Sequence, residues 1–167
     1  MTQHEIIIET AQKLATEPAW LDALIKFESG YSPTIKNKAS TARGLIQFTD
    51  DSARMLGYKD SAALVTALPT FETQMRGAVL PYLKYWGPYP SQQSLYMAVF
   101  YPKFRYSPVD TVFPDSVQKV NPGIVTVQDY IHFVNRRISF TAVKKSASLA
   151  GLVLAGALVY MFVKYVR

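Results

Sequence analysis

The stretch that decides the fold runs from Glu28 to Gly57 and reads ESGYSPTIKNKASTARGLIQFTDDSARMLG. Apolar residues at helical spacing precede it and predict a helix that stops at Gly30, with Glu28 continuing the apolar face of that helix. Polar, turn-forming residues over 31–43 predict a loop or a small hairpin. Thr49, followed by two acidic residues, predicts the start of the next helix. One carboxylate thus ends an apolar helix face next to an irregular loop.

Glu28 is the candidate catalytic acid. Burial beside apolar side chains such as Leu24 and Ile25 disfavours the ionised form of a carboxyl group, so we expect its pKa to lie above the ordinary value of about 4.3. A carboxyl group that stays protonated near neutral pH can act as a general acid. From this feature alone, a partly exposed glutamate near a helix end remains the alternative.

The fold class that we expect is mainly α with a small β element. Thr16 is the predicted cap of the second helix, and Pro81 is expected to bend or break a later one. Further helices are predicted over 3–15, 60–68, 71–86, 91–101 and from 126 onward, the last behind a capping box of Thr126 and Asp129.

A transmembrane helix is predicted over 146–163, where eighteen residues carry no charge. Such a length nearly crosses a hydrocarbon core of about 30 Å. Basic residues flank both sides, as expected for a membrane span, and a buried core helix is the alternative reading. The predicted organisation is a domain over 1–125, a linking helix with a basic membrane flank over 126–145, the span over 146–163 and a basic tail over 164–167.

The charges and the rare residue types exclude several function classes. The chain has 167 residues and a formal net charge of +6, but residues 1–135 hold twelve basic and twelve acidic residues. The excess flanks the apolar run, which argues against nucleic-acid binding. No cysteine and only two histidines are present, so we expect no metal site and no cofactor. Residues 1–16 do not resemble a signal peptide, so we expect a single-pass membrane protein that is anchored at its C-terminal end.

Three separated elements of the quoted stretch resemble the lysozyme-like lytic transglycosylase family, of the soluble lytic transglycosylase type. They are Glu28-Ser29, the run Gly44-Leu45-Ile46-Gln47-Phe48, and Leu56-Gly57. The resemblance implies a helical lysozyme-like fold with a small β element. It also implies cleavage of the bond between N-acetylmuramic acid and N-acetylglucosamine in the glycan strands of peptidoglycan.

The resemblance also implies roles for individual residues. Glu28 becomes the catalytic acid. The family's later Ala-Tyr-Asn element, whose tyrosine lies beside the acid, has its nearest counterpart at Tyr101, whereas Tyr96 fits the core equally well. The implied substrate-binding residues are Ser29, Ser40 in the loop, Gly44 for close approach of the backbone, Gln47 and Phe48 in the glycan groove, and Tyr101.

The acidic residues favour a transglycosylase over a hydrolase. Hydrolysis normally needs a second carboxylate across the scissile bond, and none lies between Glu28 and Asp50. Thr49 stands where the related goose-type lysozymes carry an aspartate. A lytic transglycosylase needs no second carboxylate, because the muramic C6 hydroxyl closes a 1,6-anhydro ring. A hydrolytic lysozyme that uses Asp50 or Asp51 is the alternative.

An enzyme that cuts murein and carries a C-terminal anchor suits a bacteriophage virion, which must open the cell wall locally during genome entry. The expected location is therefore a virion membrane or an ejected complex, and otherwise the bacterial inner membrane. Expected partners are the glycan strands, a lipid bilayer through 146–163 and other virion membrane proteins. A non-catalytic virion protein with a lysozyme-like fold, acting in structure or penetration, is the alternative of a different class.

Overall fold

Helices make up most of residues 1–136, the part of the chain that the computed structural model describes. The mainly helical fold that the sequence predicts is confirmed. The elements are α1 (Gln3–Lys13), α2 (Pro18–Ser29), α3 (Asp50–Met55), α4 (Ser61–Ala67), α5 (Phe71–Gln74), the π-helical turn η1 (Met75–Val79), α6 (Leu80–Trp86), α7 (Gln92–Phe100), the 3-10 turn η2 (Pro102–Phe104), α8 (Asp115–Val120) and a helix over 127–136.

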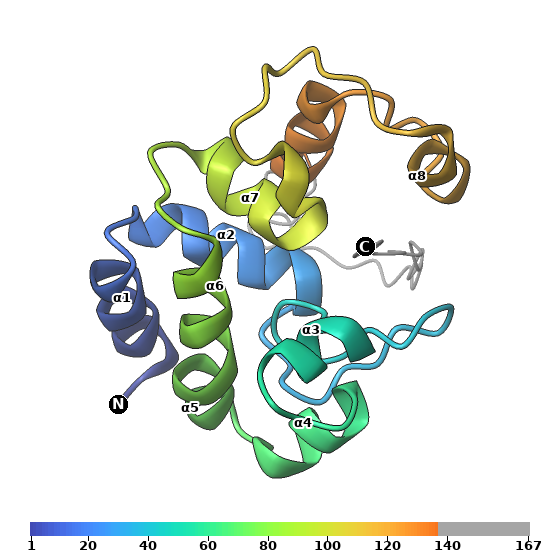
Figure 1. Cartoon of the computed structure of the whole chain (residues 1–167). Coiled ribbons are helices and arrows are strands. Elements are labelled where there is room, and N and C mark those ends of the chain that lie inside the picture. The colour runs from blue at the N-terminus through green and yellow to red at the C-terminus, as the bar shows by residue number, and fades with distance from the viewer. Residues whose placement is uncertain (137–167) are drawn as a thin grey trace, which may run out of the picture.

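Helix α2 runs across the middle of the molecule (Figure 1), with α1, α5 and α6 below its N-terminal part and α3 and α4 below its C-terminal end. Its Leu21, Leu24 and Ile25 are fully buried. Helix α7 lies across the top of this arrangement in the same view. The apolar face that the sequence predicts for α2 is therefore the centre of the core.

Most predicted helix ends are confirmed by the structure. The Thr49 side chain accepts a hydrogen bond from the Ser52 backbone N–H, and Ser91 does the same for Ser94. Thr126 and Asp129 form the reciprocal capping box. Thr16 was wrongly predicted as a cap, because Pro18 begins α2 and places Glu17 at the cap position, where no side-chain bond forms.

The predicted helix over 71–86 is continuous but changes its winding halfway. In the π turn the Leu80 backbone N–H donates to the Met75 carbonyl, five residues earlier. Pro81 follows this turn and has no N–H to donate, so it is accommodated where the regular α pattern is already interrupted. Pro81 therefore does not break the helix.

The small β element consists of isolated bridges within the loop that follows α2. Lys36 pairs with Arg43, and Arg43 pairs with Phe48 through two backbone hydrogen bonds of 2.9 and 2.7 Å. We call residues 31–49 the motif loop. It closes back on itself before α3 begins, and pairing this short is too weak to hold a loop by itself.

The helix over 127–136 belongs to the same core as the rest of the described chain. Its Val127, Tyr130 and Val134 are fully buried against the core. The start of the predicted linking helix therefore packs into the same core as the residues before it, and the boundary at residue 125 stays a prediction.

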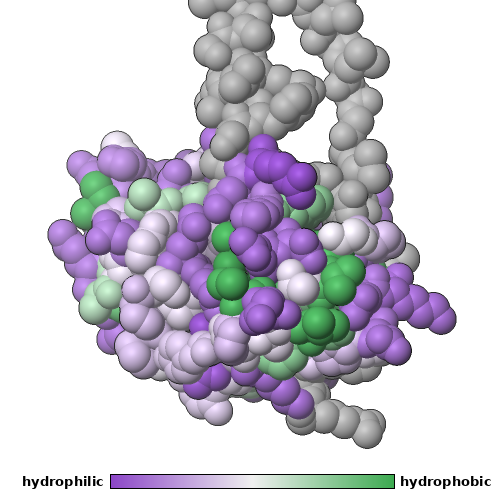
Figure 2. Space-filling model, turned by 90° about the horizontal axis from the view of Figure 1, so that it is seen from above, coloured by the Kyte–Doolittle hydropathy of each residue, from purple (hydrophilic) through white to green (hydrophobic). Residues whose placement is uncertain are grey.

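The predicted transmembrane helix over 146–163, the end of the linking helix and the basic tail lie outside the described residues. No helix within residues 1–136 is long and apolar enough to cross a membrane. Seen from above, the described surface is largely hydrophilic, with small apolar areas (Figure 2).

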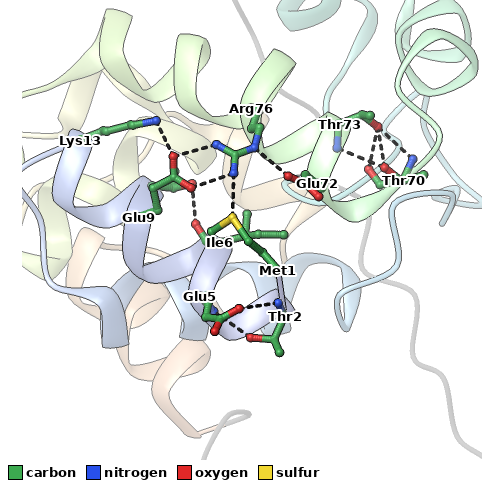
Figure 3. Close-up of polar contacts among 11 residues, drawn as sticks. Met1, Thr2, Glu5, Ile6, Glu9, Lys13, Thr70, Glu72, Thr73 and Arg76 are labelled. Atoms are coloured by element: carbon green, nitrogen blue, oxygen red, sulfur yellow. Dashed lines mark hydrogen bonds and ion pairs between the residues drawn. The ribbon is translucent and has the colours of Figure 1, made fainter.

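A cluster of charged side chains ties the first helix to the fifth and to the π turn (Figure 3). Arg76 donates to both carboxylate oxygens of Glu9, at 2.7 and 2.8 Å, and to Glu72 at 3.0 Å. Lys13 also binds Glu9. These hydrogen bonds, mainly those from Arg76, lower the pKa of Glu9 to about 2. Because the side chains are partly exposed to solvent, we expect only a modest contribution to stability.

Candidate active site

Glu28 lies in the last turn of α2 and is only 8% exposed. Two residues later Gly30 adopts a left-handed conformation with φ of 57°, which ends the helix and turns the chain into the motif loop. Leu24, one turn earlier, is fully buried. The carboxylate is therefore at the junction of a buried helix face and an irregular loop, as the sequence predicts.

The negative charge of Glu28 affects the pKa of two buried tyrosines from later in the chain. Burial raises the pKa of Tyr82, on α6, and the negative charge of Glu28 raises it further. Burial and the Glu28 charge likewise raise the pKa of Tyr130 well above its ordinary value. The Tyr130 hydroxyl is buried without a hydrogen bond of ordinary geometry within the described chain, whereas the Tyr82 hydroxyl donates to the Ala98 carbonyl at 3.2 Å.

Sequence reasoning missed both tyrosines. Tyr130 falls on the apolar face that Val127 and Val134 define, so helical periodicity marks it only as a core residue. Tyr82 follows Pro81, where the helix was expected to bend or break. The sequence offered one indication: each tyrosine carries a hydroxyl group on an otherwise apolar helix face, and a buried tyrosine hydroxyl usually has a polar neighbour.

Tyr101, the predicted counterpart of the family's tyrosine, lies in an aromatic cluster. Its side chain is 9% exposed, and its ring contacts those of Phe104 and Phe113, with centroids 4.8 and 5.7 Å away. Tyr96, the alternative, is a core residue whose hydroxyl accepts a hydrogen bond from Gln92. The tyrosines whose pKa the Glu28 charge raises are instead Tyr82 and Tyr130.

Gln47 and Gly44 form a tight turn in the motif loop. Gln47 has a φ of 53°, and its side-chain amide donates to the Gly44 carbonyl at 3.1 Å. Gly44 has a φ of 75°, and a Cβ atom there would lie 2.4 Å from the Gln74 Oε1 atom. Glycine is thus needed at this position because a protein side chain fills the space beside it.

Phe48 is fully buried, and its predicted place in the glycan groove stays a prediction. Its ring packs edge-on against that of Tyr82, with centroids 5.9 Å apart. An aromatic side chain at the end of the loop gains more from burial than from exposure. Phe48 thereby connects the motif loop to a tyrosine beside Glu28.

The two predicted serines already make local hydrogen bonds. The buried Ser29 hydroxyl donates to the Ile25 carbonyl within α2, at 3.0 Å. Ser40, in the motif loop, is half-buried and accepts a hydrogen bond from the Ala42 backbone N–H at 3.2 Å. Their predicted role in substrate binding stays a prediction.

The two acidic residues after Thr49 are bound to other parts of the protein. The Asp50 carboxylate accepts hydrogen bonds from the backbone N–H and the hydroxyl of Ser61, at 3.0 and 2.9 Å. Burial raises the pKa of Asp50, but these bonds outweigh it and the net shift is downward. Asp51 forms an ion pair with Arg54 on its own helix. Neither carboxylate is held toward Glu28 by these contacts.

Within residues 1–136, no group of three or more His, Cys, Asp or Glu side chains could hold a metal ion. The Glu28 carboxyl group is buried, and its charge raises the pKa of the Tyr82 and Tyr130 phenols. Such a carboxyl group can donate a proton and later accept one.

Residues 5–68 match the family described as Transglycosylase SLT domain, which covers less than half of the chain. No curated protein and no solved structure is significantly similar to it. The matched residues include α2 with Glu28, the whole motif loop, α3 and α4. The match supports a relation of this region to the lysozyme-like lytic transglycosylases, and an activity of the peptidoglycan-cleaving transglycosylase type.

Proposed function

We propose that this protein is a lytic transglycosylase that cuts the bond between N-acetylmuramic acid and N-acetylglucosamine and leaves a 1,6-anhydro end. The single observation that carries the proposal is the position of Glu28. It is a buried carboxyl group at the end of α2, within the region that matches the transglycosylase domain.

Glu28 performs both proton transfers in this reaction. Its carboxyl group protonates the glycosidic oxygen, and the bond from that oxygen to C1 of the muramic acid breaks. The C6 hydroxyl of the same sugar attacks C1 and loses its proton to the Glu28 carboxylate, which restores the acid. No water is consumed, and the tethered hydroxyl has a large effective concentration at C1.

The contacts of Asp50 and Asp51 favour ring closure over hydrolysis. A hydrolase needs a carboxylate to activate water or to stabilise a glycosyl intermediate. Asp50 is engaged by Ser61 and Asp51 by Arg54. Either would have to leave these partners to serve a hydrolytic mechanism.

The cellular setting that we propose is a bacteriophage virion whose membrane or ejected complex carries the enzyme to the cell wall during genome entry. Residues 146–163 anchor the protein in the bilayer, and other virion membrane proteins are its neighbours. This part rests on the apolar, uncharged run and its basic flanks in the sequence. Flotation of the full chain with phospholipid vesicles tests the anchor, and a chain ending at residue 137 should stay at the bottom of the gradient.

The enzymatic proposal is tested by digesting purified murein with the full chain and analysing the fragments by mass spectrometry. Ring closure yields muropeptides one water lighter than those from hydrolysis. Reducing muramic acid ends as the main product would make the protein a lysozyme, and Asp50 and Asp51 would then be mutated first. Intact murein after incubation would instead favour a non-catalytic role in structure or penetration.

A further inference from the structure

Gln74 is a fully buried polar side chain at the end of α5, beyond the residues that match the transglycosylase family. Its Oε1 atom accepts a hydrogen bond from the Leu45 backbone N–H at 2.8 Å. Its Nε2 atom donates to the Pro33 carbonyl at 2.7 Å and to the Leu68 carbonyl at 3.0 Å. One amide group thus joins the start of the motif loop, its Gly44–Phe48 run and the segment before α5.

These contacts demand a primary amide in one orientation. Two carbonyl groups face the Nε2 atom and one N–H faces the Oε1 atom, so exchanging the two atoms would break all three bonds. An unpaired buried polar group costs about 1–3 kcal/mol, so the orientation is strongly preferred. Gly44 completes the fit, because a Cβ atom there would lie 2.4 Å from the same Oε1 atom.

The π turn after Gln74 explains how two side chains of one continuous helix, Gln74 and Tyr82, both contact the motif loop. In an unbroken α-helix, Tyr82 would lie about 80° beyond two full turns from Gln74, at about 100° per residue. The extra residue of a π turn removes about 100°, which leaves the two side chains within about 20° of each other. Gln74 accordingly contacts Leu45, and the Tyr82 ring contacts Phe48.

We propose that Gln74 is a positioning residue, which holds the motif loop in register with Glu28 through its contacts to Leu45, Pro33 and Leu68. The proposal rests on the proposed function, since it assigns to the loop a part in placing the glycan. The isolated bridges of the loop leave its position to such anchors. Misplacing a reactive group by about 1 Å can lower a rate by about a hundredfold.

The experiment compares the full chain with Gln74→Met, which keeps the length of the side chain and removes its amide. Gln118→Met is the matched control, because Gln118 also donates from a side-chain amide to a backbone carbonyl, that of Phe113 at 2.7 Å, but on α8. Hydrogen exchange at the Leu45 amide and the kcat and KM on soluble glycan strands are measured for each.

We expect Gln74→Met to speed hydrogen exchange at the Leu45 amide by about tenfold or more, because the variant removes the hydrogen bond that protects this amide. We also expect kcat to fall about tenfold or more with a smaller change in KM, whereas Gln118→Met leaves both near their original values. Unchanged exchange at Leu45, or a kcat no lower than that of the control, would overturn the proposal.

Gln74→Glu provides a second test if the methionine variant folds poorly. Near neutral pH the carboxylate of this variant would be repelled by the Pro33 and Leu68 carbonyl oxygens. Once protonated, the carboxyl group can again accept a hydrogen bond from the Leu45 N–H and donate one to a carbonyl. Protection of the Leu45 amide should therefore return on acidification, and its absence at every pH would contradict the contact. If the unaltered chain cuts no murein, the proposed function fails, while the Leu45 exchange still shows whether Gln74 holds the loop.

Discussion

Residues 5–68 and residues 69–136 contribute differently to the candidate site. The first region matches the transglycosylase family and supplies Glu28 and the motif loop. The second region supplies what surrounds them: Gln74, Tyr82 and Tyr130. The difference teaches that a local pattern can point to a candidate reactive group, whereas the residues around that group come from sequence without such a pattern.

The second region also packs directly against the end of α2. The Tyr130 ring stacks on Phe100, with centroids 4.0 Å apart, and meets Phe27 of α2 edge-on at 6.4 Å. Phe100 in turn contacts Phe113 at 5.3 Å. This aromatic cluster buries the helix end that carries Glu28, so it sets the polarity around the acid.

The largest effect that we expect comes from Glu28→Gln, which keeps the shape of the side chain and removes its exchangeable proton. Cleavage of murein should fall by about 10² to 10⁴, the usual contribution of general acid catalysis. Glu17→Gln, at the exposed other end of α2, is the control and should be nearly neutral. Full activity of Glu28→Gln, measured by release of soluble muropeptides, would place the acid elsewhere.

A smaller effect is expected for Tyr130→Phe, which removes the hydroxyl beside Glu28 and keeps the ring stacking. A phenol dipole near a carboxylate favours the charged form, so its loss should move the alkaline limb of the kcat profile to higher pH. Tyr96→Phe removes a buried hydroxyl that binds Gln92 and should leave the profile in place. Identical profiles for all three proteins would show that the second region does not tune the acid.

Thr49→Ala tests whether the helix after the motif loop depends on its cap. Loss of an N-cap hydrogen bond should lower stability by about 1 kcal/mol, and thermal unfolding should occur about 3 °C lower. Ser91→Ala removes the equivalent cap of α7 and should cost about as much. Only Thr49→Ala should also reduce murein cleavage, and an equal reduction in both variants would remove the distinction between the two regions.

The smallest effect is expected for Glu9→Gln, which breaks the ion pair between α1 and Arg76 in the second region. The folded-state pKa of Glu9 is lowered to about 2, below the unfolded value of about 4.3. The stabilisation is therefore fully present above about pH 4.3 and is lost as the pH falls toward about 2. Urea unfolding should separate the variant from the unaltered protein at pH 7 and not at pH 2, and a constant difference would contradict the assignment.

Most of the local structure could be predicted from the sequence, because caps and turns depend on neighbouring residues. Thr49 and Thr126 were identified as helix starts and Gly30, with a φ of 57°, as a stop. The prediction at Thr16 failed because Pro18 fixes the first turn of α2 one position later.

The site was only partly predictable for the same reason. Glu28 stood out because a carboxylate continued an apolar helical stripe, a pattern within one helix. The family resemblance assigned substrate-binding roles to Phe48, Gly44 and Tyr101. In the structure the rings of Phe48 and Tyr101 pack against other aromatic rings, and the Gln74 side chain occupies the space beside Gly44. Such contacts join residues far apart in the chain, which spacing along the chain does not reveal.

By itself, the sequence determined the helical class, the acid at the end of α2 and the loop after it, since these follow from periodicity and turn chemistry within short stretches. The tertiary structure alone decided which side chains surround that acid. Tyr82 and Tyr130 reach it only because α6 and the helix over 127–136 pack into the same core. Gln74 meets Leu45 only because burial brings the two segments together, where their polar groups must pair.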